Sequence, residues 1–326
     1  ALCSCGLSCL VAEQYRPSRQ PDHMKNILVI GGSYFAGRVL VEELLAAGGY
    51  VPYLMNRGNR PLRLEGVCEI VCDRHDGAGM ASAVAAHEWH AVVDFCAYAP
   101  GDIATLLQHL PGVVRQYIYI STATVHRSST HLPMSDDAAK LTGPSPGREG
   151  VYAYHKWLLE QELARCCEEK AIPYVSLRPA MVYGKYNYAP RESWLFDLIS
   201  KGEPIILPPP PQALFSMVSV WDLAWICIAC LDNGAVAGGA YAVCADELVS
   251  CDRLIEALET ITSRKFDVRR QTVRVLNAAG LPLPFPLEEH LVYSGARLRQ
   301  ILQHRFLSLE EGMSRTYEWY RQADGR

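Results

Sequence analysis

The sequence predicts an α/β protein built on a doubly wound parallel sheet, with a smaller C-terminal lobe. Short apolar runs of strand length alternate with segments of helical period through the first half of the chain. The first of these runs ends in a pair of glycines that opens a helical segment. After Gly184 the composition becomes aromatic and polar. A chain of 326 residues exceeds the common size of one domain, which favours a large unit with an appended lobe.

The first strand, turn and helix lie at residues 26–45. An apolar run at 26–30 ends in glycines, and a further glycine precedes a segment with helical spacing of valine and leucine. Such a turn lets the backbone approach a pyrophosphate, while the helix N-terminus offers free N–H groups. The pattern favours a dinucleotide site over an ordinary strand–helix turn. The expected cofactor contacts here are Gly31, Gly32, Tyr34, Phe35 and Gly37.

The second strand is expected at Tyr50–Asn56. In a dinucleotide fold, the end of this strand meets the adenosine ribose about 20 residues after the glycine motif. Asn56 lies 56 − 37 = 19 residues beyond Gly37, and Arg57 follows it. An arginine favours a 2′-phosphate, so NADP is preferred over NAD. The alternative is that Arg57 only begins a solvated loop.

Further strands and helices alternate up to residue 121. Strands are expected at 69–72, 91–95 and 116–121, and helices at 78–87 and 103–110. Asp73 ends the first of these strands, where its carboxylate could accept a hydrogen bond from an adenine amino group. This spacing predicts parallel strands, whose ligand site lies at their carboxyl ends.

Hydroxyl groups and a tyrosine–lysine pair form a second constellation. The strand at 116–121 leads into Thr122 and Thr124, and about thirty residues later come Tyr152 and Lys156. Spacing of i, i+4 puts the latter two side chains on one helix face. An ammonium near a phenol favours the phenolate, so we expect Lys156 to lower the pKa of Tyr152 towards the neutral range.

With these motifs the chain resembles an extended short-chain dehydrogenase/reductase of the NAD-dependent epimerase/dehydratase family. The resemblance runs from Asn26 almost to the end and includes 177–184, 218–224 and 308–320. It implies a Rossmann fold in which Thr122, Tyr152 and Lys156 are catalytic. Tyr152 would exchange a proton with a substrate hydroxyl or ketone, Thr122 would bond the same oxygen, and Lys156 would also hold the nicotinamide ribose.

Three positions depart from the family pattern. Tyr34 replaces the middle glycine of the motif, as in a subgroup that resembles chloroplast stem-loop RNA-binding proteins and their bacterial relatives. Met181 stands where sugar-nucleotide members often have asparagine. Ala123 and Thr124 replace the Asp-Glu pair of 4,6-dehydratases, so dehydration by that route lacks its acid and base.

The expected organisation follows from the motifs and the resemblance. Residues 1–23 form an extension outside the fold, 24–184 and 215–245 form the dinucleotide-binding domain, and 185–214 and 246–326 form the substrate-binding lobe. Substrate contacts are expected from Thr124, Met181 and Arg191, although a lone arginine near a helix start is as well explained by solvation.

Bulk properties set limits on partners. The net charge of -4 and pI of about 6.2 give no reason to expect a nucleic-acid partner. The twelve cysteines are scattered along the chain, and the Cys227/Cys230 pair has no further metal ligands near it in sequence. We therefore expect buried thiols in a reduced, cytoplasmic protein, and we expect no metal site. No apolar run has the length of a membrane helix. Homodimerisation is implied by the family alone.

The expected function is an NAD(P)-dependent epimerase or oxidoreductase acting on a hydroxyl or ketone carbon of a sugar nucleotide or related polar metabolite. Two alternatives remain open. One is an NADPH-dependent ketoreductase of a non-sugar substrate, and the other is a non-catalytic dinucleotide- or RNA-binding relative.

Overall fold

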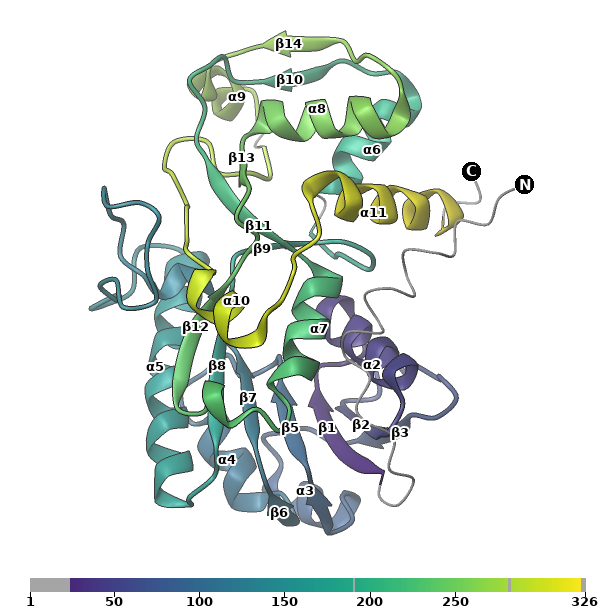
Figure 1. Cartoon of the computed structure of the whole chain (residues 1–326), viewed down its shortest axis with the longest axis vertical. Helices are drawn as coiled ribbons and strands as arrows, with labels where there is room; N and C mark the ends of the chain where they lie inside the picture. Colours follow the sequence, from purple (N-terminus) through teal and green to yellow (C-terminus); the bar gives the residue numbers. More distant parts are fainter. Residues whose placement is uncertain (1–23, 190, 281–282, 324–326) are drawn as a thin grey trace.

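A seven-stranded sheet forms the centre of the molecule in the computed structural model, which describes residues 24–189, 191–280 and 283–323 (Figure 1). Every strand pairing within it is parallel, and the spatial order is β12-β8-β7-β5-β1-β2-β3. The strands are β1 (Lys25–Ile30), β2 (Tyr50–Asn56), β3 (Cys68–Val71), β5 (Ala91–Asp94), β7 (Tyr117–Ile120), β8 (Tyr174–Pro179) and β12 (Gly239–Val243). The predicted doubly wound α/β fold is confirmed.

Helices cover both faces of this sheet because successive strand residues point to opposite sides. In β1, Ile27 and Val29 pack in one buried cluster with helices α2 (Phe35–Ala47) and α7 (Val220–Cys230). Leu28 and Ile30 pack on the other face. That face is covered by α3 (Gly77–Ala83), α4 (Asp102–His109) and α5 (Arg148–Glu169). Burial on both faces explains why the strands are nearly continuous apolar runs.

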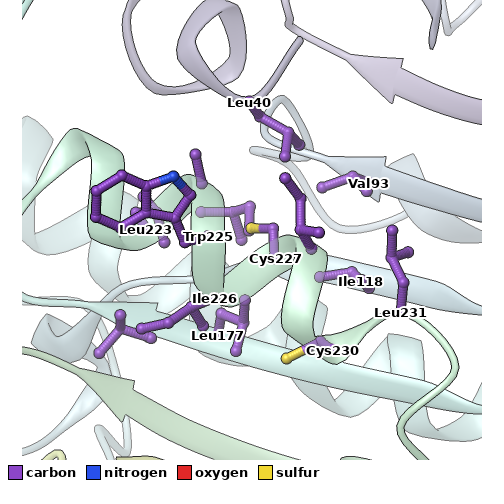
Figure 2. Close-up of a cluster of buried hydrophobic side chains, with 14 of the residues drawn as sticks. Leu40, Val93, Ile118, Leu177, Leu223, Trp225, Ile226, Cys227, Cys230 and Leu231 are labelled. Atoms are coloured by element: carbon purple, nitrogen blue, oxygen red, sulfur yellow. The ribbon is translucent and has the colours of Figure 1, made fainter. Parts of the chain in front are cut away.

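Helix α7 carries the Cys227/Cys230 pair into the first of these clusters (Figure 2). Both thiols are buried among aliphatic side chains of the sheet. Burial raises the pKa of Cys230 to about 12 and that of Cys227 well above its ordinary value. These cysteines therefore behave as packed apolar groups.

The C-terminal half adds a lobe with its own buried cluster. Three strands form one sheet in the order β13-β11-β9, and two others pair as β10-β14. The elements of the lobe are β9 (Met181–Tyr183), α6 (Glu192–Lys201), β10 (Ile205–Leu207), β11 (Phe215–Ser219), β13 (Leu248–Val249), α8 (Cys251–Thr262), β14 (Val268–Arg270), α9 (Val273–Ala278) and α11 (Leu309–Ala323). Helix α10 (Ala296–Leu302) packs against β12 and α7 of the large sheet instead. Figure 1 shows most of this lobe stacked beyond the carboxyl ends of the large sheet.

Strand β11 connects the lobe to the large sheet. It pairs with β9 and β13, whereas the helix α7 that follows it packs on the large sheet. The domain boundaries expected at 184/185, 214/215 and 245/246 stay a prediction. Residues 1–23, expected to form an extension, lie outside the described residues.

One predicted helix is wrong in extent. Residues 78–87 were expected to be helical, but α3 ends at Ala83 and Val84 is extended. His87–Trp89 then forms β4, which pairs with β6 (Gly112–Val114). The pairing of β4 with β6 overrides the helix preference of the alanine-rich segment. It allows Trp89, the last residue of β4, to be fully buried against the large sheet. Across the described part of the chain, no helix combines the length and apolarity that crossing a membrane requires.

Candidate functional site

The glycine turn between β1 and α2 is closed by tight backbone packing. Gly31 has a φ of +87°, and a Cβ on it would lie 2.3 Å from the Sγ atom of Cys96. A Cβ on Gly37 would lie 2.4 Å from the carbonyl oxygen of Gly31. Glycine is therefore required at both positions for the turn to form.

The turn has hydrogen-bond donors that suit an anion. Helix α2 begins at Phe35, and its N-cap residue, Tyr34, makes no side-chain capping bond, so its first N–H groups are open to a ligand. The Oγ atom of Ser33 is buried and has no hydrogen-bond partner within the described residues. A phosphate oxygen accepting from these donors would satisfy them. Ser33 was not among the predicted contacts, although a hydroxyl inside a glycine turn is a signal that could have identified it.

Two bulky side chains occupy the same turn. Tyr34 is extended, with φ −149° and ψ 150°, and its side chain stacks on Tyr188 with ring centres 5.7 Å apart. The guanidinium of Arg60 lies over the same Tyr34 ring, with its central carbon 4.6 Å from the ring centre. Phe35 has a φ of 43°, which is unusual for a residue other than glycine, and meets Tyr188 edge-on.

The predicted ribose and adenine contacts lie at the ends of β2 and β3. Asn56 is half-buried, and its Oδ1 accepts a hydrogen bond of 2.6 Å from the N–H of Gly58. Arg57 is exposed. The carboxylate of Asp73 accepts from the N–H of His75 at 2.9 Å, and this bond lowers its pKa. Asp73 therefore stays ionised and is already engaged by its neighbour.

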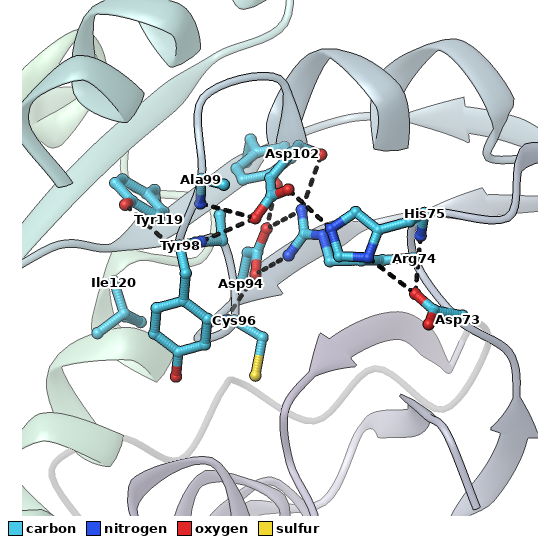
Figure 3. A network of polar contacts seen from close by, with 12 residues as sticks. Asp73, Arg74, His75, Asp94, Cys96, Tyr98, Ala99, Asp102, Tyr119 and Ile120 are labelled. Carbon is cyan, nitrogen blue, oxygen red and sulfur yellow. Dashed lines mark hydrogen bonds and ion pairs between the residues drawn. The ribbon is translucent and has the colours of Figure 1, made fainter. Parts of the chain in front are cut away.

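A buried ionic network supports this end of the sheet (Figure 3). Arg74 donates two hydrogen bonds of 2.9 Å to Asp94, and the hydroxyl of Tyr117 donates a third at 2.6 Å. Burial alone would raise the pKa of Asp94, but Arg74 and Tyr117 hold it below its ordinary value. The imidazole of His75 joins the network through Asp102, at 2.9 Å. Sequence reasoning did not find this network, because its members come from three separate segments.

The hydroxyl cluster lies where β7 ends. Thr122 is buried, and its Oγ1 is 2.9 Å from the Oγ1 of Thr124. The N–H of Thr124 also donates to Thr122 as a short 3₁₀ turn, η1 (Ala123–Val125), begins. Thr124 is exposed and lines a cavity of about 450 Å³. The cavity wall also includes His126, Arg127, Ser128, Met134, Leu141, Thr142, Leu291 and Tyr293.

Lys156 joins the strand end to the helix that carries Tyr152. Its Nζ donates a hydrogen bond of 2.8 Å to the carbonyl oxygen of Ile120, two residues before Thr122. The same nitrogen lies 5.7 Å from the ring centre of Tyr152. Rings of Tyr98 and Tyr119 each stand 4.8 Å from it. The structure thus brings the i, i+4 pair together beside the hydroxyl-bearing strand.

The predicted effect of Lys156 on Tyr152 is wrong, because the pKa of Tyr152 lies above its ordinary value and not below it. Desolvation raises the pKa of Tyr152 to about 12, and Tyr188 adds to the increase. Desolvation also lowers the pKa of Lys156 to about 8. The reason is geometric, because the ammonium donates to the strand carbonyl and is surrounded by rings.

The two other predicted substrate contacts lie away from this cavity. Met181 is half-buried and packs against the buried cluster of the lobe. Arg191 precedes α6, and its Nη1 donates to the carbonyl oxygen of Val182 at 3.2 Å. Neither residue lines the cavity beside Thr124.

Comparison with known proteins gives a match to one family model and a likeness of fold. Residues 102–244 match the model of the NAD dependent epimerase/dehydratase family. The chloroplast stem-loop binding protein of 41 kDa b from Arabidopsis thaliana is 28% identical over 247 residues, 72% of this chain and 62% of the relative. A UDP-glucose 4-epimerase from Vibrio cholerae is 26% identical over 161 residues, 48% of this chain and 47% of the relative. The chain thus spans about half to three fifths of the length of these curated relatives.

Among solved structures, a UDP-glucose-4-epimerase from Stenotrophomonas maltophila, with bound NAD and formylated UDP-arabinopyranose, superposes with a TM-score of 0.75. It shares 16% sequence identity, and the match covers 92% of this chain and 99% of that chain. This likeness shows that the two proteins share a fold.

Proposed function

Because residues 102–244 match the model of the NAD dependent epimerase/dehydratase family, we propose that this protein is an NAD(P)-dependent epimerase acting on a hydroxyl carbon of a sugar nucleotide. The observation that carries the proposal is the position of Lys156. Its Nζ is bonded to Ile120 at the end of β7 and lies beside the ring of Tyr152. One side chain therefore links the strand end that bears Thr122 to the tyrosine that would exchange the proton.

Each residue has a distinct task in this proposal. Thr122 and Tyr152 hold the substrate oxygen, and the phenol of Tyr152 takes up or releases its proton. Lys156 fixes the position of Tyr152 and adds positive charge to the site. A nicotinamide dinucleotide, when bound, supplies the hydride acceptor and donor. The phenol of Tyr152 is protonated at neutral pH, since its pKa lies above even the ordinary tyrosine value of about 10.

The glycine turn would hold the dinucleotide. Ser33 and the open N–H groups at the start of α2 suit its diphosphate, and Gly31, Gly32 and Gly37 permit the close approach. Structural neighbours bind NAD. A preference for NADP is the finer proposal, and it rests on the exposed Arg57 after β2.

The substrate would lie between Thr122 and the lobe. A cavity of about 450 Å³ beside Thr124 has the size of an ordinary ligand pocket. Its wall mixes hydroxyl side chains with Met134, Leu141 and Leu291, which suits a ring bearing hydroxyl groups. Met181 and Arg191 would contact a more distant part of the substrate. A cytoplasmic location and a homodimeric assembly remain predictions.

The direct test uses UDP-glucose as the probe, with NAD or NADP, and follows UDP-galactose by chromatography and reduced nicotinamide by absorbance. Isomer formation without net cofactor reduction supports the epimerase, whereas steady NADPH consumption with a ketone substrate supports the alternative ketoreductase. Tyr152→Phe should lower turnover about 10²- to 10⁴-fold. Tyr154→Phe is the matched control and should leave turnover unchanged. Equal turnover by Tyr152→Phe and the wild type would overturn the catalytic assignment.

A second candidate function is RNA binding, since the chloroplast relative is named as a stem-loop binding protein. The net charge of -4 opposes it, because nucleic-acid affinity depends on basic surface. A gel-shift titration with an RNA hairpin separates the two candidates. Binding that weakens steeply with salt would support this function, and no shift at micromolar protein would exclude it.

A further inference from the structure

Tyr34 occupies the position at which a dinucleotide motif normally has its second glycine, which lets the backbone approach the pyrophosphate. Its backbone is extended, so tyrosine causes no strain there. Its side chain is 40% exposed. The ring therefore lies at the surface of the turn where the diphosphate is expected. Its position there depends on the side chains that contact it.

Two side chains from distant segments hold the Tyr34 ring. Tyr188 comes from the segment between β9 and α6, and its ring is nearly parallel to that of Tyr34, with an interplanar angle of 22°. Arg60 comes from the loop after β2 and lies over the Tyr34 ring. We call Tyr34, Tyr188 and Arg60 the clasp. Aromatic stacking and a cation over a ring are both attractive contacts.

The segment that carries Tyr188 is anchored next to the clasp. Lys185 and Tyr186 both bond Glu42 of α2, at 2.6 and 2.9 Å. The guanidinium of Arg38 lies 3.8 Å from the ring centre of Tyr186. Tyr188 itself is 68% exposed. The contacts of Tyr188 with Tyr34 and Phe35 can therefore break while Lys185 and Tyr186 remain bonded to α2.

The clasp lies along the expected path of a dinucleotide. The diphosphate meets the glycine turn, which contains Tyr34, and the adenosine ribose meets the end of β2, just before Arg60. The contact between Tyr34 and Arg60 bridges these two places. A dinucleotide bound in this way would lie against the ring that Tyr188 and Arg60 hold.

We propose that the clasp is a gate on cofactor exchange: the Tyr34–Tyr188 stack must part to admit or release the nicotinamide dinucleotide, and it keeps the cofactor bound between turnovers. This inference rests on the proposed function and deepens it. An epimerase returns the hydride to the same substrate and has no need to exchange its cofactor. A slow gate therefore favours the epimerase over a reductase that releases its cofactor in each cycle.

Stopped-flow fluorescence of NADPH, and separately of NADH, tests the gate in the full chain. Tyr188→Ala removes the stack, and Tyr188→Phe is the matched control that keeps it. Opening a gate speeds both directions, so Tyr188→Ala should raise the association and dissociation rate constants together, each about two- to tenfold, as expected for loss of one aromatic pair. The equilibrium dissociation constant should change less than either rate. Tyr188→Phe should resemble the wild type.

The other outcomes overturn the gate. Unchanged rates in Tyr188→Ala would show that the stack does not limit exchange. A rise in dissociation alone would make Tyr188 a simple wall of the site. Binding of neither NADPH nor NADH by any of these proteins would overturn the proposed function as well, so the two failures are distinguishable. Thermal unfolding of Tyr188→Ala checks that the exposed substitution leaves the fold intact.

Discussion

The ammonium nitrogen of Lys156 lies 5.7 Å from the ring centre of Tyr152, yet it donates its hydrogen bond to the carbonyl oxygen of Ile120 at 2.8 Å. The lysine is fully buried, with rings of Tyr98 and Tyr119 on its other sides. One carbonyl and several ring faces replace only part of the hydration that the ammonium loses. The folded protein therefore holds this charge at a cost in stability, which a functional site can tolerate.

This cost predicts a pH-dependent stability. The pKa of Lys156 falls from 10.5 to about 8 on folding. Between about pH 8 and pH 9.5 the unfolded chain binds more protons at this group, so the free energy of unfolding should rise with pH. In Lys156→Met this contribution disappears. Urea unfolding of both proteins across that range should show a steeper rise for the wild type.

The difference between the two slopes is the measured quantity, because other groups titrate alike in both proteins. The window ends below pH 10, since tyrosines with raised pKa values make stability fall above it. Parallel slopes in the two proteins would show that burial does not lower the pKa of Lys156.

Local patterns in the sequence were enough to predict most of the large sheet. The second strand has the predicted bounds, Tyr50–Asn56, because a buried parallel strand is a nearly continuous apolar run. The i, i+4 spacing also placed Tyr152 and Lys156 together on α5. These features depend on residues close in sequence.

Contacts between distant segments could not be predicted in this way. Lys156 bonds a carbonyl 36 positions away, and Arg74 pairs with a carboxylate 20 positions away. Strand order and loop paths determine which donors and acceptors come into contact. Where a donor has two possible acceptors, the fold also determines which of them it bonds. For this reason the orientation of Lys156, and with it the direction of the pKa change of Tyr152, differed from the expectation.

Tyr98 should position α5, the helix that carries the proposed catalytic residues Tyr152 and Lys156. Its ring lies 4.8 Å from the Nζ of Lys156 and 6.2 Å from the ring centre of Tyr152. Tyr98→Ala removes this face and should lower kcat about two- to tenfold, as expected for loss of a cation–π contact. Tyr98→Phe keeps the ring and should retain activity. Equal losses in the two variants would assign the effect to the hydroxyl instead.

Arg57 should select the cofactor. Its exposed guanidinium follows the strand end at which the adenosine ribose is expected. Arg57→Asp replaces an attraction for the 2′-phosphate with a repulsion, so the ratio of NADPH to NADH affinity should fall at least about tenfold. Titration of intrinsic fluorescence with each dinucleotide measures both constants.

Arg63→Asp makes the same change in charge on the same exposed loop and serves as the control for Arg57. It should shift the affinity ratio much less, because a general electrostatic effect on a solvated loop is screened by salt. An unchanged ratio in Arg57→Asp would show that this arginine is only solvated.

The buried pair of Arg74 and Asp94 should be essential for stability. Removing the arginine in Arg74→Met leaves the Asp94 carboxylate buried with Tyr117 as its remaining side-chain donor. Loss of one partner of a buried ion pair costs about 3–5 kcal/mol of unfolding free energy, and urea unfolding at neutral pH measures this loss.

The same pair predicts a dependence on acid. Because its pKa is lowered, the Asp94 carboxylate stabilises the fold at pH values above the ordinary carboxyl pKa, so acid should remove this contribution in the wild type. In Arg74→Met that loss should be smaller. The control Arg115→Met, at an exposed ion pair, should lower the free energy of unfolding far less than Arg74→Met does.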